Sequence, residues 1–148
     1  MCLGGYTGSQ DDTIQYVTIA STGNATDFGN LASATGGTAG TSSSTRGVVA
    51  GGGTPSKVNV IQYVTIASTS NTTDFGDLTV AKSNMTINGS NSTIGIFGGG
   101  QTPSLSLTID SITFVSTGNG QDFGDMINSV NAGGYGQCGN SNGHGGLQ

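Results

Sequence analysis

The chain reads Ile61-Gln62-Tyr63-Val64-Thr65-Ile66-Ala67-Ser68 near its middle. This stretch decides the fold because it occurs three times in the sequence. An identical copy starts at Ile14, and a looser copy starts at Ile109. An Asp-Phe-Gly triplet follows each copy and begins at Asp27, Asp74 and Asp122. The copies start at residues 14, 61 and 109, so the period is 47 and then 48 residues. A constant period of this length indicates an array of similar structural units.

Each period contains short β-branched runs separated by turns rich in Gly, Asn, Thr and Pro, such as 46–50 and 60–66. Such runs predict an all-β sandwich, barrel or propeller, and we see no segment with helical periodicity. We therefore expect one repeat domain over 1–148. We expect its units to be 1–31, 32–78 and 79–126, with 127–148 completing a blade.

The main strand carries large apolar residues on both faces. Ile61 and Tyr63 lie on one face, and Val64 and Ile66 lie on the other. A short run that is apolar on both sides is typical of a strand covered on both sides, and in a repeat array the neighbouring units supply that cover. We therefore expect this strand to lie between neighbouring repeats.

The repeat also predicts structural anchors. Phe28, Phe75 and Phe123 recur once per unit, and we expect them to fill the space between repeats. Glycines at strand ends allow positive φ and close chain approach. The Asp before each Phe-Gly is expected to bond its own turn. The predicted anchors are Tyr16, Tyr63, Phe28, Phe75, Phe123, Gly51, Gly52, Gly98 and Gly99.

The pattern resembles a kelch-type β-propeller blade. The shared features are Val48-Val49-Ala50-Gly51-Gly52, Ile61-Gln62-Tyr63, Asn71-Thr72-Thr73 and Phe75-Gly76-Asp77-Leu78, with Ala81-Lys82 where kelch blades carry a small residue and Arg. The chain departs from that pattern in having no Trp and in placing Ser111 where the other copies have Tyr. The resemblance implies kelch-like blades.

A more specific resemblance is to repetitive virion proteins of tailed bacteriophages, especially those of aquatic cyanobacteria. It rests on unusual runs of sequence, namely Tyr63–Ser68, Asp74–Ala81, Ser42–Gly47 and the tail Ser141–Leu147. It implies a structural or adhesive virion component, made in the host cytoplasm and exposed on the particle. It supplies no catalytic residue.

Three repeats are too few for a closed propeller, which usually needs about 4–8 blades. Leu3-Gly4-Gly5 aligns with Ala50-Gly51-Gly52, so the first unit starts inside a blade. We therefore expect strands of another chain to complete the array. Two chains would give a six-blade ring, and an open arrangement would give a filament.

The composition excludes several classes of function. Net charge is −5, with only Arg46, Lys57 and Lys82 basic, which argues against nucleic-acid binding. No apolar run approaches the roughly 20 residues of a membrane span, and no signal peptide is visible after Met1. Cys2 and Cys138 are expected to be reduced thiols, with a disulfide between them as the alternative.

The residues that could carry chemistry have simpler explanations. Asp-Phe-Gly is also the metal-binding triplet of kinases, but the other kinase motifs are missing. His144 and Cys138 are too few for zinc. Asp74 with Asp77, and Asp122 with Asp125, could bind calcium, although turn capping is the preferred interpretation. The Asn-x-Ser/Thr triplets at Asn24, Asn71, Asn84, Asn88 and Asn91 are attributed to composition.

We therefore predict a non-enzymatic virion structural protein, a tail, fibre or capsid-surface component, with no cofactor and no bound metal. Its expected partners are copies of itself and other virion proteins. The alternatives are a host-surface glycan-binding adhesin, for which host polysaccharide would be the partner, and a self-assembling extracellular filament. The adhesive alternative would rest on many weak contacts that add up.

Overall fold

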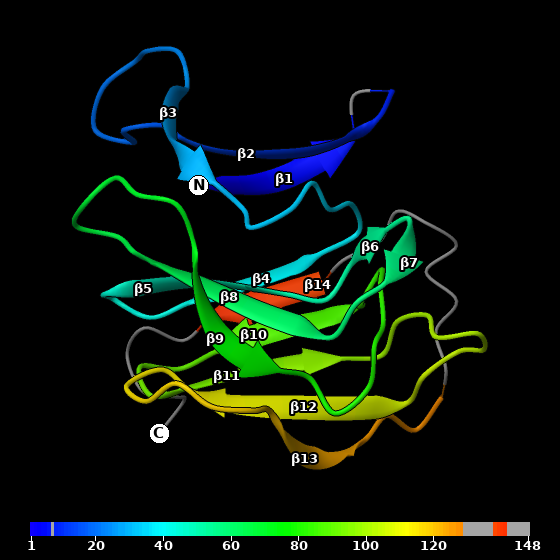
Figure 1. Cartoon of the computed structure of the whole chain (residues 1–148). Coiled ribbons are helices and arrows are strands. Elements are labelled where there is room, and N and C mark those ends of the chain that lie inside the picture. The colour runs from blue at the N-terminus through cyan, green and yellow to red at the C-terminus, as the bar shows by residue number, and fades with distance from the viewer. Residues whose placement is uncertain (7, 129–137, 142–148) are drawn as a thin grey trace.

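The computed structural model describes residues 1–6, 8–128 and 138–141. These residues form three main sheets of antiparallel strands and contain no helix, which confirms the all-β prediction. Figure 1 shows the three sheets lying one above another in sequence order. The described sheets do not close into a ring.

The strands divide among the sheets by repeat. The first sheet contains β1 (Cys2–Tyr6), β2 (Gln10–Tyr16) and β3 (Thr26–Asn30). The second sheet contains β4 (Ala39–Ser42), β5 (Arg46–Ala50), β8 (Val60–Thr65) and β9 (Thr73–Asp77). The third sheet contains β10 (Ile87–Ser90), β11 (Ile94–Gly98), β12 (Thr108–Thr113), β13 (Gln121–Asp125) and β14 (Cys138–Ser141). A small hairpin of β6 (Gly53–Thr54) and β7 (Ser56–Lys57) projects from the second repeat.

Each Asp-Phe-Gly triplet is a β-bulge on an edge strand. Ile14, Ile61 and Ile109 pair with Gly29, Gly76 and Gly124, and the register shifts at the next position in all three sheets. The Phe is therefore the extra residue of the bulge. The Gly adopts φ of +146°, +146° and +136° in the three copies, which favours glycine.

The aspartate of the triplet bonds its own turn, as predicted. Asp27 Oδ1 accepts a hydrogen bond from Gly29 N–H at 3.1 Å, and Asp122 Oδ1 accepts one from Gly124 N–H at 3.0 Å. This bond is an Asx turn, in which the side chain replaces a backbone acceptor.

Two apolar layers separate the sheets. We call the layer between the first and second sheets the first interface and the layer between the second and third sheets the second interface. Ile61 belongs to the core of the second interface, whereas Val64 on the same strand belongs to the core of the first. The prediction that the main strand is covered on both faces is confirmed.

The equivalent strands β4 and β10 also contact each other side by side. Asn88 Nδ2 donates to Gly40 O at 2.8 Å, and Ser90 Oγ donates to Ser42 O at 2.9 Å. Thr41 Oγ1 donates in the other direction, to Gly89 O at 3.1 Å. These bonds hold matching positions of successive repeats together at one edge of the stack.

The predicted glycine anchors take two forms. Gly51, Gly52 and Gly99 have positive φ, and a Cβ on Gly51 would lie 2.4 Å from Lys82 O. Gly98 instead lies in β11 with ordinary φ, and a Cβ placed on it would lie 3.0 Å from Ile109 Cγ1. Both forms follow from close approach of the backbone.

The segment 127–148 is described only in part. Its strand β14 pairs in parallel with β10. The prediction that this segment completes a blade depends mainly on residues outside the described ones. Cys2 is an exposed free thiol, and the side chain of Cys138 is outside the described set.

Candidate assembly interface

The two interfaces share one backbone arrangement, in which a turn of the following repeat grips the bulged edge strand of the preceding one. At the first interface Asn30 N–H donates to Asn71 Oδ1 at 3.0 Å, and Thr72 N–H donates to Asn30 O at 2.9 Å. At the second, Asp77 N–H donates to Asn119 Oδ1 at 3.1 Å, and Gly120 N–H donates to Asp77 O at 2.7 Å. We call this arrangement the clamp.

The bulge glycine lets the clamp close. A Cβ on Gly29 would lie 2.3 Å from Ser70 O, and a Cβ on Gly76 would lie 2.4 Å from Gly118 O. No side chain fits at such distances from backbone, so only glycine allows the turn to reach the edge strand.

The bulge phenylalanines occupy the space beside the clamp. Phe28 packs edge-on against Tyr16 and Phe75 packs edge-on against Tyr63, each with ring centroids 5.8 Å apart. Phe28 is 5% exposed and Phe75 is 3% exposed. Phe28 belongs to the apolar core of the first interface, and Phe75 belongs to that of the second.

The polar centre differs between the interfaces. At the first, Gln62 Oε1 accepts a hydrogen bond from Ala32 N–H at 2.8 Å. At the second, the equivalent residue Asp110 accepts from Thr79 N–H at 3.0 Å, and its Oδ2 lies 2.6 Å from Lys82 Nζ. Lys82 and Asp110 are both fully buried, so the ion pair depends on this full set of partners.

All three basic side chains of the chain donate hydrogen bonds to backbone carbonyls of the third repeat. Arg46 donates to Phe114 O and lies over the Tyr63 ring, with its guanidinium carbon 4.5 Å from the ring centroid. Lys57 donates to Thr102 O, and Lys82 donates to Thr108 O at 2.9 Å. The second interface is therefore the charged one.

The outer face of the third sheet carries the equivalents of residues that are buried in the other sheets. We call it the trailing face, and it comprises Ile96, Ile109, Phe123 and Met126. Phe123 is 61% exposed, so within the single copy it does not fill a space between repeats, and its predicted role as an anchor stays a prediction. The physical reason is that no following repeat among the described residues covers it.

The outer face of the first sheet is the matching surface. We call it the leading face, and it comprises Cys2, Gln15 and Val17. Val17 is 52% exposed, whereas its equivalents Val64 and Ile112 are 1% and 4% exposed. The stack therefore ends in two unlike faces, each of which has a buried counterpart inside the molecule.

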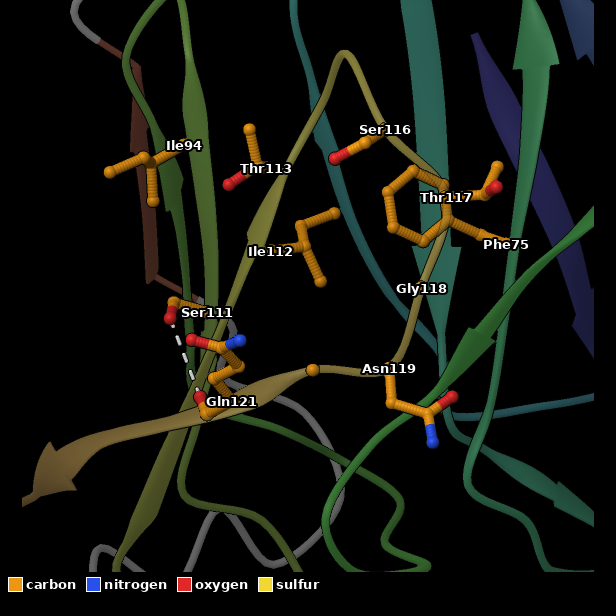
Figure 2. Close-up of a pocket in the computed structure, with 11 residues that line it drawn as sticks. Phe75, Ile94, Ser111, Ile112, Thr113, Ser116, Thr117, Gly118, Asn119 and Gln121 are labelled. Carbon is orange, nitrogen blue, oxygen red and sulfur yellow. Dashed lines mark hydrogen bonds between the residues drawn. The ribbon is translucent and has the colours of Figure 1, made fainter.

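A neutral hollow lies beside the clamp of the second interface. It encloses about 620 Å³, and most of its polar lining consists of hydroxyl and amide groups. Figure 2 shows Phe75 close to the turn of Ser116 to Gly118, with Asn119 and Gln121 following it. Ser111 Oγ donates to Gln121 O at 3.4 Å. A similar hollow lies beside Phe28 at the first interface and includes Ser68 and Thr69.

The structure does not bring the other candidate residues of the sequence together into a site. The described residues contain no group of three His, Cys, Asp or Glu side chains that could hold a metal ion. His144 lies outside the described residues. None of the described segments is a helix that is long and apolar enough to cross a membrane.

The scan against protein-family models finds no match. The search of curated proteins finds no match either.

The sequence interpretation missed the residues that define the interfaces. Asn71 was placed in the Asn71-Thr72-Thr73 segment of the kelch resemblance and in a glycosylation triplet, and Asn119 was given no role. An Asn stands at the same repeat position in all three copies, at 24, 71 and 119, and this regularity is the signal that could have found the clamp. The Lys82–Asp110 pair has no such signal, because each residue is charged in one repeat only.

Proposed function

We propose that this chain is a non-enzymatic structural subunit of a tailed-phage virion that assembles through its β repeats. The observation that carries the proposal is the exposure of Phe123 on the trailing face, at a position that is buried in both preceding repeats. An apolar residue with two buried equivalents indicates a surface made to be covered.

The sheet architecture supports kelch-like blades as the repeat unit. The second sheet has the order β4-β5-β8-β9, with each successive pair antiparallel. A four-stranded antiparallel sheet packed face to face with its neighbours is typical of a propeller blade. The first sheet has three described strands, and the third adds β14 in parallel to four antiparallel strands. Strands of other chains would then complete the array.

The use of the polar residues supports a structural role. Asp27 and Asp122 bond their own turns, and Asp110 is buried in an ion pair. These carboxylates stabilise loops and interfaces. Hydrolysis of a glycoside would instead need two carboxylates facing each other across a cleft.

Two measurements test the proposal. Mass spectrometry of purified virions should find the chain at a fixed copy number per particle, and the purified chain should sediment as an oligomer. Absence from the particles would contradict the virion role. A monomer at every concentration would contradict assembly through the repeats.

Host-surface glycan binding is a second candidate, favoured by the neutral hollows. Hydroxyl and amide groups beside an aromatic ring suit a neutral sugar. The hollow at the first interface offers hydroxyl groups and an aromatic ring, and a second site of this kind would allow multivalent binding. Purified protein should then bind host cells, and free host polysaccharide should compete. Binding that persists under competition would contradict this function.

A further inference from the structure

Both halves of the clamp occur a third time in the chain, at opposite ends of the stack. The turn Gly23-Asn24-Ala25 is equivalent to Ser70-Asn71-Thr72, and it belongs to the first repeat. The bulged edge Phe123-Gly124-Asp125 is equivalent to Phe75-Gly76-Asp77, and it belongs to the last described repeat. Asn24 is exposed.

The bulge of the third sheet has the shape that accepts a clamp turn, although no turn among the described residues lies against it. Gly124 keeps φ of +136°, yet a Cβ placed on it would meet no described atom within 4 Å. Its equivalents Gly29 and Gly76 have φ of +146° and meet a backbone carbonyl closely. Gly23 likewise has nothing within 4 Å.

We propose that the trailing face of one copy binds the leading face of a second copy by forming the clamp between chains. This inference rests on the proposed function, since it names the partner through which the repeats assemble. The occupant is a second copy because the same chain carries the turn, the edge strand and both apolar faces, each with a filled example inside the molecule.

The internal clamps specify the bonds of the new contact. Asp125 N–H donates to Asn24 Oδ1 of the second copy, and Ala25 N–H of that copy donates to Asp125 O. A third bond follows from the second interface, where Gly118 N–H donates to Phe75 O at 2.7 Å. The equivalent bond runs from Gly23 N–H to Phe123 O.

The polar centre of the contact follows the first interface. Gln15 is the equivalent of Gln62, and Ile127 N–H is the equivalent of Ala32 N–H. Gln15 is exposed, and Ile127 is almost fully exposed. Gln15 Oε1 therefore accepts from Ile127 N–H of the neighbouring copy. This centre is neutral, so added salt does not weaken the contact.

The contact is head-to-tail, because its two faces differ. Such a contact generates a ring if the rotation closes and a filament if it does not. In either case each copy uses one leading face and one trailing face. A variant blocked at one face therefore cannot pair with itself but can pair with a variant blocked at the other.

The experiment uses Val17→Asp to block the leading face and Phe123→Asp to block the trailing face. Both side chains are more than half exposed in the single copy, so the folded copy tolerates them. Val80→Asp is the matched control, since Val80 is 43% exposed and belongs to neither face. Sedimentation velocity over a concentration series measures the assemblies, and circular dichroism checks folding.

Wild type and V80D should assemble alike. V17D alone and F123D alone should each be monomeric, and their equimolar mixture should give species of two chains and none larger. Assembly of either variant alone, or a folded mixture that stays monomeric while wild type assembles, would overturn the head-to-tail contact and leave self-assembly standing. A monomeric wild type would overturn both.

Asn24→Ala tests the clamp bond itself. It removes one acceptor from the contact, so assembly should weaken by roughly 2- to 10-fold. Asn91→Ala is the control, because Asn91 Oδ1 accepts from Thr93 N–H within its own turn. Equal affinities for the two variants would overturn the role of Asn24.

Discussion

The first and second interfaces use the same clamp around different polar centres. Gln62 at the first is replaced by Asp110 at the second, and Thr35 is replaced by Lys82. Two clamp bonds have equivalent partners at both interfaces, and the second interface adds a bond from Gly118 N–H to Phe75 O. Glycine and asparagine therefore determine how the repeats stack, whereas the buried polar side chains distinguish the first interface from the second.

The Lys82–Asp110 ion pair makes the second interface chemically different from the first, although the repeats are similar in sequence. A buried ion pair is weak evidence for added stability, and specifying register is its best-attested use. A neutral face placed against Lys82 would leave a buried charge unpaired. The backbone of Lys82 is bound to the second repeat, since Lys82 N–H donates to Val58 O. We infer that the pair therefore keeps the third repeat on the second and leaves the neutral faces for other copies.

The largest expected effect comes from breaking the ion pair on one side. Lys82→Met leaves Asp110 buried without a counter-charge, so the free energy of unfolding should fall by about 3–5 kcal/mol. Urea denaturation measures it. The double variant K82T/D110Q copies the first interface and should recover most of the loss. A double variant as unstable as the single would contradict the equivalence of the two centres.

Truncation of Phe75 at the second interface should lower stability more than truncation of Phe123 on the exposed trailing face. Phe75→Ala empties a buried site and should cost about 3–4 kcal/mol of unfolding free energy. Phe123→Ala should change the stability of the isolated copy by no more than about 0.5 kcal/mol. Urea titration at low protein concentration compares them. Equal losses would show that Phe123 is covered within one copy.

The bulge glycines allow the same comparison for the backbone, between an edge strand that is covered by a clamp turn and one that is not. Gly76→Ala forces Gly118 away and opens the clamp, which should cost about 2–3 kcal/mol through lost hydrogen bonds and strain. Gly124→Ala adds strain alone, about 1 kcal/mol, because none of the described turns of the single copy lies against it. Thermal melts of the two variants should therefore differ. Identical melts would contradict the clamp.

The smallest expected effect is a pH dependence of stability that arises from Asp11 in the first repeat and has no equivalent in the second. Hydrogen bonds from the backbone N–H and then the hydroxyl of Thr13 lower the pKa of Asp11 below its ordinary value of 3.8. A lowered folded-state pKa stabilises above the ordinary value, and the benefit is lost as pH falls through the folded pKa.

Asp11→Asn should therefore be less stable than wild type near neutral pH, and the difference should shrink in acid. Chemical denaturation at several pH values from roughly 6 down to 2 measures this. Val58 is the equivalent of Asp11 in the second repeat and does not titrate. A pH-independent difference between Asp11→Asn and wild type would assign the effect to something other than this carboxylate.

The main strand and the bulge could be predicted because each depends on local sequence. Apolar residues on both faces of 60–66 predicted cover on both sides, and Asp-Phe-Gly predicted a turn bonded by its own Asp. The exposure of Phe123 could not be read from its triplet, since burial depends on the next repeat. The Lys82–Asp110 pair joins residues that are far apart in the sequence, and because each of them is charged in one repeat only, the repeat pattern does not reveal it.

Amide hydrogen exchange tests the central claim, that one clamp joins repeats within and between copies, most directly. Thr72 and Gly120 amides should be protected at every concentration, because their clamps are internal. The Ala25 amide should be unprotected in dilute solution and protected in the assembled wild type, and it should stay unprotected in F123D. An Ala25 amide that exchanges freely in the assembly would contradict the account.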